Sequence, residues 1–261
     1  MSPWIVAYLD AFLLFVLVLM RLGSLVMTLP WLGPGVLPWQ VRVVLAVTGA
    51  LLVTPLFFGQ SLPPVDNLAM LALLMVREAL LGVALGLAIT VLVAGMQLAG
   101  QAIGQTSGMS LADVADPTFE SSVPIAAQLL EKSAIVLFLL IGGHRQVLAA
   151  LLDSFTVMPP GEARLPSDLM SLLGEVVATS FEIGLRAAAP VMAALLAATL
   201  LVALISRSLP QLNAVVVGLN LNALLVLAAL ALTVGVAAWV LIEPAQQAVI
   251  AWRSAVGLVQ E

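Results

Sequence analysis

The chain has 261 residues, of which 62% are hydrophobic and only 9% are charged. A soluble domain carries about 25% charged residues, so this composition indicates an integral membrane protein and excludes a disordered chain. The net charge of −5 provides no basic surface for nucleic acid. With no cysteine and a single histidine, we expect neither disulfides nor a His- or Cys-based metal site, and no cofactor or enzymatic activity.

Six apolar stretches are candidates to cross the hydrocarbon core of a bilayer, which needs about 20 residues as helix. In chain order they cover residues 11–29, 43–58, 68–100, 123–142, 169–206 and 212–242. Three of them are longer than the helix needed for one perpendicular crossing of the bilayer, so we expect helices that tilt, bend or extend beyond the lipid. Pro190 is a natural position for a kink in the fifth stretch. The sequence therefore predicts an all-α integral membrane protein with long, partly broken helices arranged as helical hairpins.

Charged residues lie inside several of these stretches, where each costs about 2.5–3.5 kcal/mol near the bilayer centre. They are Arg77, Glu78, Glu131, Lys132, Glu175, Glu182 and Arg186. Glu175, Glu182 and Arg186 recur at i, i+7 and i+11 on one helix face, and the last two form an i,i+4 pair in the favourable order. This spacing predicts a buried polar seam. The seam either lines a conduit or subunit contact, or forms a salt bridge inside a packed bundle.

Glycines recur every four residues along the third stretch and just beyond it. They are Gly82 and Gly86, followed by Gly100, Gly104 and Gly108. Such spacing lets another backbone approach closely, so these rows predict helix packing. A neighbouring row of glutamines has the same spacing and comprises Gln97, Gln101 and Gln105. The glutamines can hydrogen-bond across that contact, and ordinary helix packing is the favoured interpretation of both rows over a direct role in passage.

The segment 108–124 interrupts the helical pattern with three acidic residues and no basic one. The spacing of Asp113, Asp116 and Glu120 matches no calcium-binding loop, and the residues by themselves indicate a solvated loop. His144, in the sequence Gly-Gly-His-Arg, is interpreted as a cap or turn residue rather than a metal ligand.

An ordered set of residues runs along nearly the whole chain. It comprises Arg21, Pro30, Gly33, Pro38, Arg42, Glu78, Gly82, Gly86, Ala99–Gln101, Gly108, Asp116–Pro117, Gly143–His144, Ser154–Phe155, Pro159, Pro190, Arg207 and Pro210–Asn213. This order and spacing resemble the FliR family of flagellar export-gate proteins, whose relatives in virulence secretion are the SctT proteins. The most specific piece is a polar elbow that contains Arg207, Pro210, Gln211 and Asn213.

The resemblance implies a fold similar to a FliP-like region fused to a FliQ-like helical hairpin. The FliP-like region would cover residues 1–160 with a pore loop near 106–124, and the hairpin region would cover 168–261. In the family this loop enters the pore, which changes its interpretation from a solvated loop to a plug. The plug residues are Gly108, Met109, Leu111, Asp113, Asp116, Pro117, Phe119 and Glu120.

The resemblance also implies a function and a location. The chain would be a structural channel subunit of the flagellar type III export gate, passing unfolded flagellar subunits across the bacterial inner membrane at the basal body. Its partners would be FliP-like and FliQ-like subunits, FlhB-like and FlhA-like export components, unfolded export substrates and membrane lipid.

Two other functions remain open from the sequence. A virulence injectisome gate keeps the same family in a different machine. A secondary transporter would use Glu175, Glu182 and Arg186 as a proton or substrate site, because intramembrane charges on broken helices are transporter features. Against the transporter, the two halves of the chain show no matching pair of broken segments.

Overall fold

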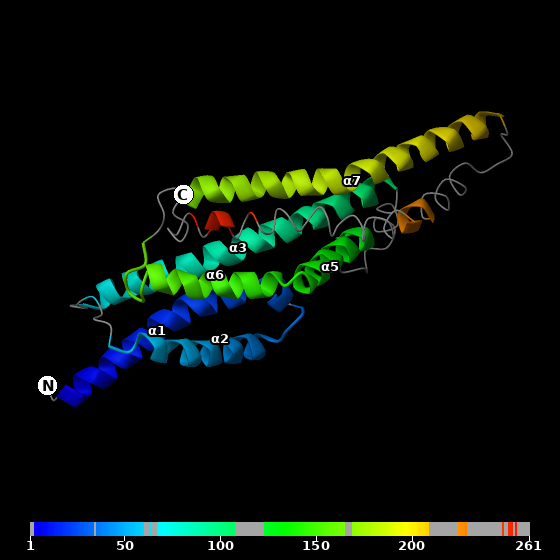
Figure 1. Ribbon diagram of the computed structural model, residues 1–261. Coiled ribbons are helices and arrows are strands. Elements are labelled where there is room, and N and C mark those ends of the chain that lie inside the picture. The colour runs from blue at the N-terminus through cyan, green and yellow to red at the C-terminus, as the bar shows by residue number, and fades with distance from the viewer. Residues whose placement is uncertain are drawn as a thin grey trace. The chain divides into compact units, whose positions relative to one another are not determined.

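The computed structural model describes residues 3–33, 35–59, 63, 67–107, 123–164, 169–208, 224–228, 247, 250–252 and 254. Over these residues the elements are all helical, which confirms the predicted all-α class (Figure 1). They are α1 (Pro3–Thr28), the short 3-10 helix η1 (Pro30–Leu32), α2 (Trp39–Val53), the 3-10 helix η2 (Thr54–Phe57), α3 (Leu68–Thr106), α5 (Ile125–Leu140), α6 (Gly143–Val157) and α7 (Leu169–Ser208).

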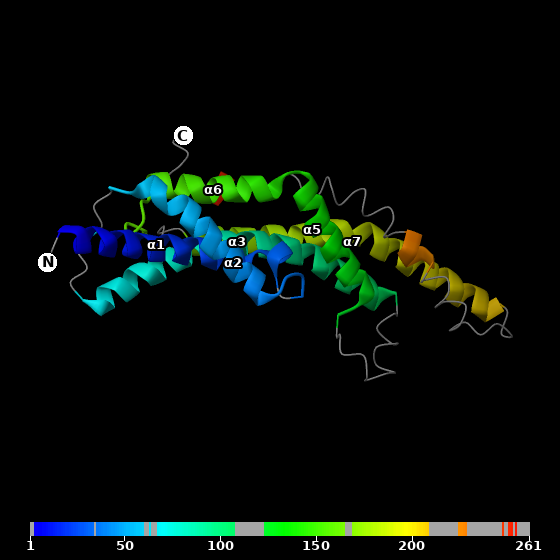
Figure 2. The same ribbon diagram turned by 90° about the horizontal axis from the view of Figure 1, so that it is seen from below.

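Four of the described helices are long and apolar enough to cross a membrane, and a fifth span results if α5 and α6 are counted as one broken crossing. Helices α3 and α7 have 39 and 40 residues (Figures 1 and 2). Each is much longer than the roughly 20 residues of one perpendicular span, as the apolar stretches predict. The sixth stretch lies almost entirely outside the described residues.

Local sequence explains where several helices begin. The Asn67 side chain accepts a hydrogen bond from the backbone N–H of Met70 over 2.8 Å and so caps the first turn of α3. Helices α2 and α5 each start directly after a proline. Gly142 separates α5 from α6 with a φ of +78°, a left-handed conformation that glycine adopts without steric cost. Helix α7 continues through Pro190.

Helix α6 was not among the six predicted stretches, because it is amphipathic rather than continuously apolar. The buried residues Val147, Ala150, Leu151, Ser154 and Phe155 recur at i, i+3, i+4, i+7 and i+8. This is the spacing of one helix face. A search for a 3.6-residue period, in place of long apolar runs, would have found it.

The chain divides into two compact units. The first contains Met1–Thr90, Gly142–Val176 and Gln246–Glu261, and thus α1, α2, all of α6 and the beginnings of α3 and α7. Within it, α2 packs on α1, and its buried face consists of Ala46, Ala50 and Val53.

The second unit contains Val91–Ile141 and Val177–Ala245, and thus the end of α3, α5 and most of α7. Because α3 and α7 each contribute to both units, neither unit is a separate segment of the chain. The predicted boundary near residues 160–168 stays a prediction.

Candidate functional site

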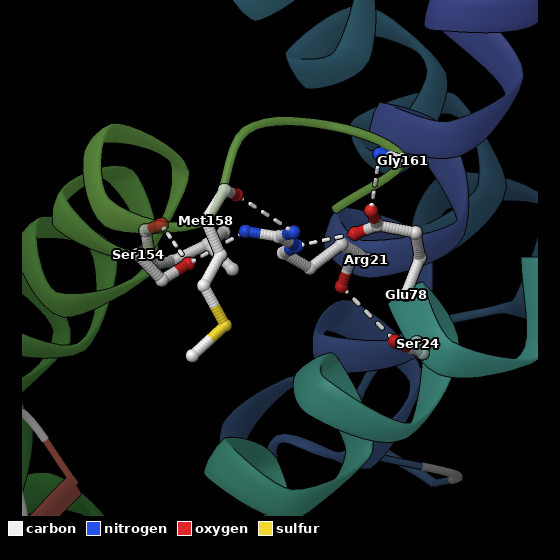
Figure 3. A network of polar contacts seen from close by, with 7 residues as sticks. Arg21, Ser24, Glu78, Ser154, Met158 and Gly161 are labelled. Carbon is white, nitrogen blue, oxygen red and sulfur yellow. Dashed lines mark hydrogen bonds and ion pairs between the residues drawn. The ribbon is translucent and has the colours of Figure 1, made fainter. Parts of the chain in front are cut away.

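A buried ion pair joins α1 to α3 in the first unit (Figure 3). The Nε atom of Arg21 donates a hydrogen bond to Oε2 of Glu78 over 2.6 Å, and both side chains are completely inaccessible to solvent. A charge within an apolar helix is costly unless it has a partner. Each of these two residues provides the counter-charge of the other.

The guanidinium group of Arg21 also contacts α6 and the residue that follows it. Nη1 donates to Oγ of Ser154 over 3.2 Å, and Nη2 donates to the carbonyl oxygen of Met158 over 3.1 Å (Figure 3). The Cζ atom lies 4.2 Å from the ring centroid of Phe155, within the range of a cation–π interaction. Arg21 therefore interacts with three separate parts of the first unit.

The carboxylate of Glu78 reaches the turn after α6. Its Oε1 atom accepts a hydrogen bond from the backbone N–H of Gly161 over 2.7 Å, and Gly161 has a φ of +91°. One carboxylate thus binds the guanidinium with one oxygen and the turn with the other. We refer to Arg21, Glu78, Ser154, Met158 and Gly161 as the clasp.

The clasp unites positions that are far apart in the sequence. Arg21, Glu78, Ser154 and Phe155 all belong to the ordered set that carries the FliR resemblance, and the fold brings them together. Sequence reasoning did not pair Arg21 with Glu78, although two opposite charges in two apolar stretches were a usable signal. These contacts hold α1, α3, α6 and the turn after α6 in position within the first unit. Within the described part of the chain no cluster of three or more metal-ligating residues exists.

Close helix contacts accompany the clasp along α1 and α3. Gly82 lies against the carbonyl oxygen of Arg21 and the hydroxyl of Ser24, and Gly86 lies against the Thr28 side chain. A Cβ atom at either glycine would overlap these atoms. The glycine pair therefore sets how closely α3 approaches α1, and so the position of Glu78 beside Arg21.

In the second unit, a different set of small residues packs α3 against α5. Gly100 lies against the backbone of Ala127, and a Cβ atom at Gly104 would come within 2.9 Å of the Pro124 ring. The partner of this glycine row is thus another helix of the same chain.

Among the described residues, the glutamines do not hydrogen-bond across this glycine contact. Gln97 and Gln101 are half-buried, and neither forms a hydrogen bond with another described residue. The physical reason is the helical rotation of about 100° per residue, which places Gln101 beside the Gly100 face rather than on it.

The predicted polar seam on α7 is present but is not buried. Arg186 and Glu182 form the i,i+4 ion pair over 2.5 Å, with 69% and 57% of their side chains exposed. Glu175 is also exposed. The expectation of burial within this chain is therefore wrong, because spacing defines a helix face but not what covers it. In water, an exposed i,i+4 pair contributes about 0.3–0.5 kcal/mol, far less than a buried pair.

The remaining predicted residues divide into two groups. Arg207 is exposed in the last turn of α7, where a positive charge is favourable to the helix dipole. Other predicted residues lie outside the described part of the chain: Gly108, Met109, Leu111, Asp113, Asp116, Pro117, Phe119 and Glu120 of the plug, and Pro210, Gln211 and Asn213 of the elbow.

Comparisons with known proteins identify the family. The model of "Bacterial export proteins, family 1" matches residues 12–248. The flagellar biosynthetic protein FliR of Caulobacter vibrioides is 30% identical over 229 residues, which cover 87% of this chain and 91% of the relative. FliR of Escherichia coli is 30% identical over 204 residues, covering 78% and 77% of the two chains.

A relative from another system also matches. The surface presentation of antigens protein SpaR of Salmonella typhimurium is 28% identical over 204 residues, covering 77% of this chain and 75% of the relative. Together with the flagellar matches over most of both chains, these findings confirm the family that the ordered residues suggested. The chain belongs to the bacterial export proteins of family 1, the family of the flagellar biosynthetic protein FliR.

Proposed function

We propose that the chain is a structural channel subunit of the flagellar type III export gate, and that unfolded flagellar subunits pass through this gate across the bacterial inner membrane at the basal body. The observation that carries this proposal is the match to flagellar FliR proteins over most of the length of both chains. The four long apolar helices support a location in the membrane. The subunit provides a passage and performs no catalysis itself.

The partners in this proposal are FliP-like and FliQ-like subunits, with FlhB-like and FlhA-like components of the export apparatus. The exposed charges on α7 support such an assembly. Glu182 and Arg186 lie on a helix with a mean hydropathy of 2.5, and each would cost about 2.5–3.5 kcal/mol against lipid. A neighbouring subunit or water that covers this face removes that cost.

Co-purification tests this proposal. We expect the tagged chain, extracted from its native host in mild detergent, to carry FliP-like and FliQ-like chains with it at fixed ratios. Isolation of the chain alone, with small-solute or proton flux after reconstitution, would instead support a transporter.

The segment 106–124 forms the plug of the proposed channel. A conduit for unfolded chains has to block ions when export is idle, or it dissipates the membrane potential. Met109, Leu111 and Phe119 provide apolar groups that fill a lumen, whereas Asp113 and Asp116 exclude a position against lipid.

Shortening the chain between Gly108 and Asp116 is expected to leave co-purification with the partners intact and to make the membrane permeable to small ions. The measurement is ion conductance, or growth under salt stress, of cells that make the shortened chain. Normal ion tightness in a normally assembled complex would return this segment to a solvated loop.

A virulence injectisome gate is the second candidate function, and the match to SpaR favours it. The two machines differ in what they secrete. Loss of flagellar proteins from the medium identifies the flagellar machine, and loss of injected virulence proteins identifies the other.

A further inference from the structure

A row of partly exposed glutamines runs along α3 in the second unit. Gln97 and Gln101 are half-buried and Gln105 is exposed. Among the described residues, none exchanges a hydrogen bond with these three side chains. Three primary amides without a hydrogen-bond partner in the described part of the chain thus occupy one side of a helix that is otherwise strongly apolar.

The row follows one side of the α3–α5 pair. Gly100 meets Ala127 and Gly104 lies near Pro124, so the two helices run in opposite directions. On each helix, the residue after a contact residue points about 100° away from the contact. Because both helices are right-handed and run in opposite directions, these following residues lie on the same side of the helix pair. Gln101 and Gln105 follow the two glycines, and the half-buried Gln128 follows Ala127. The polar surface therefore extends from α3 onto α5.

Lipid is a poor occupant for this surface. An amide that leaves water without gaining a hydrogen bond costs several kcal/mol in hydrocarbon. A closely packed helix is also disfavoured, because the small residues that permit close approach lie on other faces. Gly100 and Gly104 face α5, and Gly95 lies against the backbone oxygen of Ser180 on α7.

The spacing of the row matches an extended polypeptide. Residues four apart on a helix are separated by about 6 Å along its axis. Two residues of an extended chain span about 6.6 Å, and every second residue presents its groups to the same side. Each glutamine is both a donor and an acceptor, so it can pair with the peptide groups of any sequence.

We infer that the row Gln97, Gln101 and Gln105 forms part of the conduit surface and binds the backbone of the unfolded chain in transit. This inference rests on the proposed function and specifies its substrate contact. Uncharged amides bind peptide groups without selecting side chains, which suits a passage used by many different proteins.

Single cysteines test the contact directly, since the chain has no cysteine of its own. Gln101→Cys and Gln105→Cys are made in separate chains, with Val136→Cys as the control. Val136 is 54% exposed and lies about 150° around α5 from the direction midway between Pro124 and Ala127, on the far side of the helix from α3. The substrate is a flagellar protein with one cysteine in its unfolded part and a tightly folded domain at its C-terminus, which stalls it in the gate.

After addition of a thiol oxidant, which takes up the two electrons, we expect the two glutamine positions to form disulfides with the stalled substrate several-fold more than Val136→Cys does. Disulfides to a partner subunit that form equally with and without substrate would overturn the inference and identify a subunit interface. Labelling by lipid-soluble maleimide alone would overturn it in favour of lipid.

Failure of the inference is distinguishable from failure of the proposed function. If the cysteine variants support export and the stalled substrate crosslinks elsewhere in the gate, only the glutamine contact is wrong. If cells without any copy of the chain still export normally, the proposed function is wrong.

Discussion

Glu78→Ala is expected to remove most of the folded chain, because it leaves the guanidinium of Arg21 buried and without its counter-charge. Breaking a buried ion pair from one side typically costs about 3–5 kcal/mol. That is a large share of the roughly 5–15 kcal/mol by which a folded protein is stable. The same change also removes the acceptor of the Gly161 N–H, which loosens the turn after α6.

Two control variants isolate the pair from other effects of mutation. Arg77→Ala alters the exposed neighbour of Glu78 and is expected to change stability by less than about 0.5 kcal/mol. The double variant Arg21→Met/Glu78→Leu replaces both charges with apolar groups, and is expected to be much more stable than Glu78→Ala alone. The measurement is the thermal midpoint of the purified chain in detergent, together with its level in the membrane. In a double-mutant cycle with the single variants Arg21→Met and Glu78→Leu, strictly additive losses would show that the two residues act independently.

Gly82→Ala is expected to be the most harmful change at a helical glycine of the first unit. The added methyl group overlaps the carbonyl oxygen of Arg21 and the hydroxyl of Ser24. Overpacking of this kind costs about 1–3 kcal/mol when neighbours can shift. Here the atom in the way is helix backbone, and a shift of α1 also separates Arg21 from Glu78.

Gly174→Ala is the matched control for this substitution. Gly174 lies within α7 and has no atom within 4 Å of the position of an added Cβ. Alanine there is expected to be neutral or to stabilise the chain by up to about 1 kcal/mol, because it is the better helix former. Equal thermal midpoints for Gly82→Ala and Gly174→Ala would contradict the close contact between α1 and α3.

The sequence predicted those features that depend on local properties. The length of an apolar stretch depends only on neighbouring residues in the sequence, so the apolar stretches predicted the positions of α1, α2, α3, α5 and α7. The amphipathic α6 was missed because its signal is a period rather than a run of apolar residues. Glycine spacing gave the helix faces that pack closely, whereas the identity of the packing partner needed the structure.

Features that depend on distant contacts were not predicted correctly. Arg21 and Glu78 are separated by 57 positions, and their pairing follows from the way α3 crosses α1. For Glu182 and Arg186 the pairing is local and was predicted, but burial depends on what surrounds α7, and within this chain both side chains are exposed.

The central claim is that this chain is a subunit through which flagellar proteins leave the cell. The most direct measurement is the amount of flagellar protein in the medium of its native host after the gene is deleted and then restored. We predict that secretion is lost on deletion, returns with the intact chain, and stays low with Glu78→Ala. Normal secretion of flagellar proteins without the chain would contradict the claim.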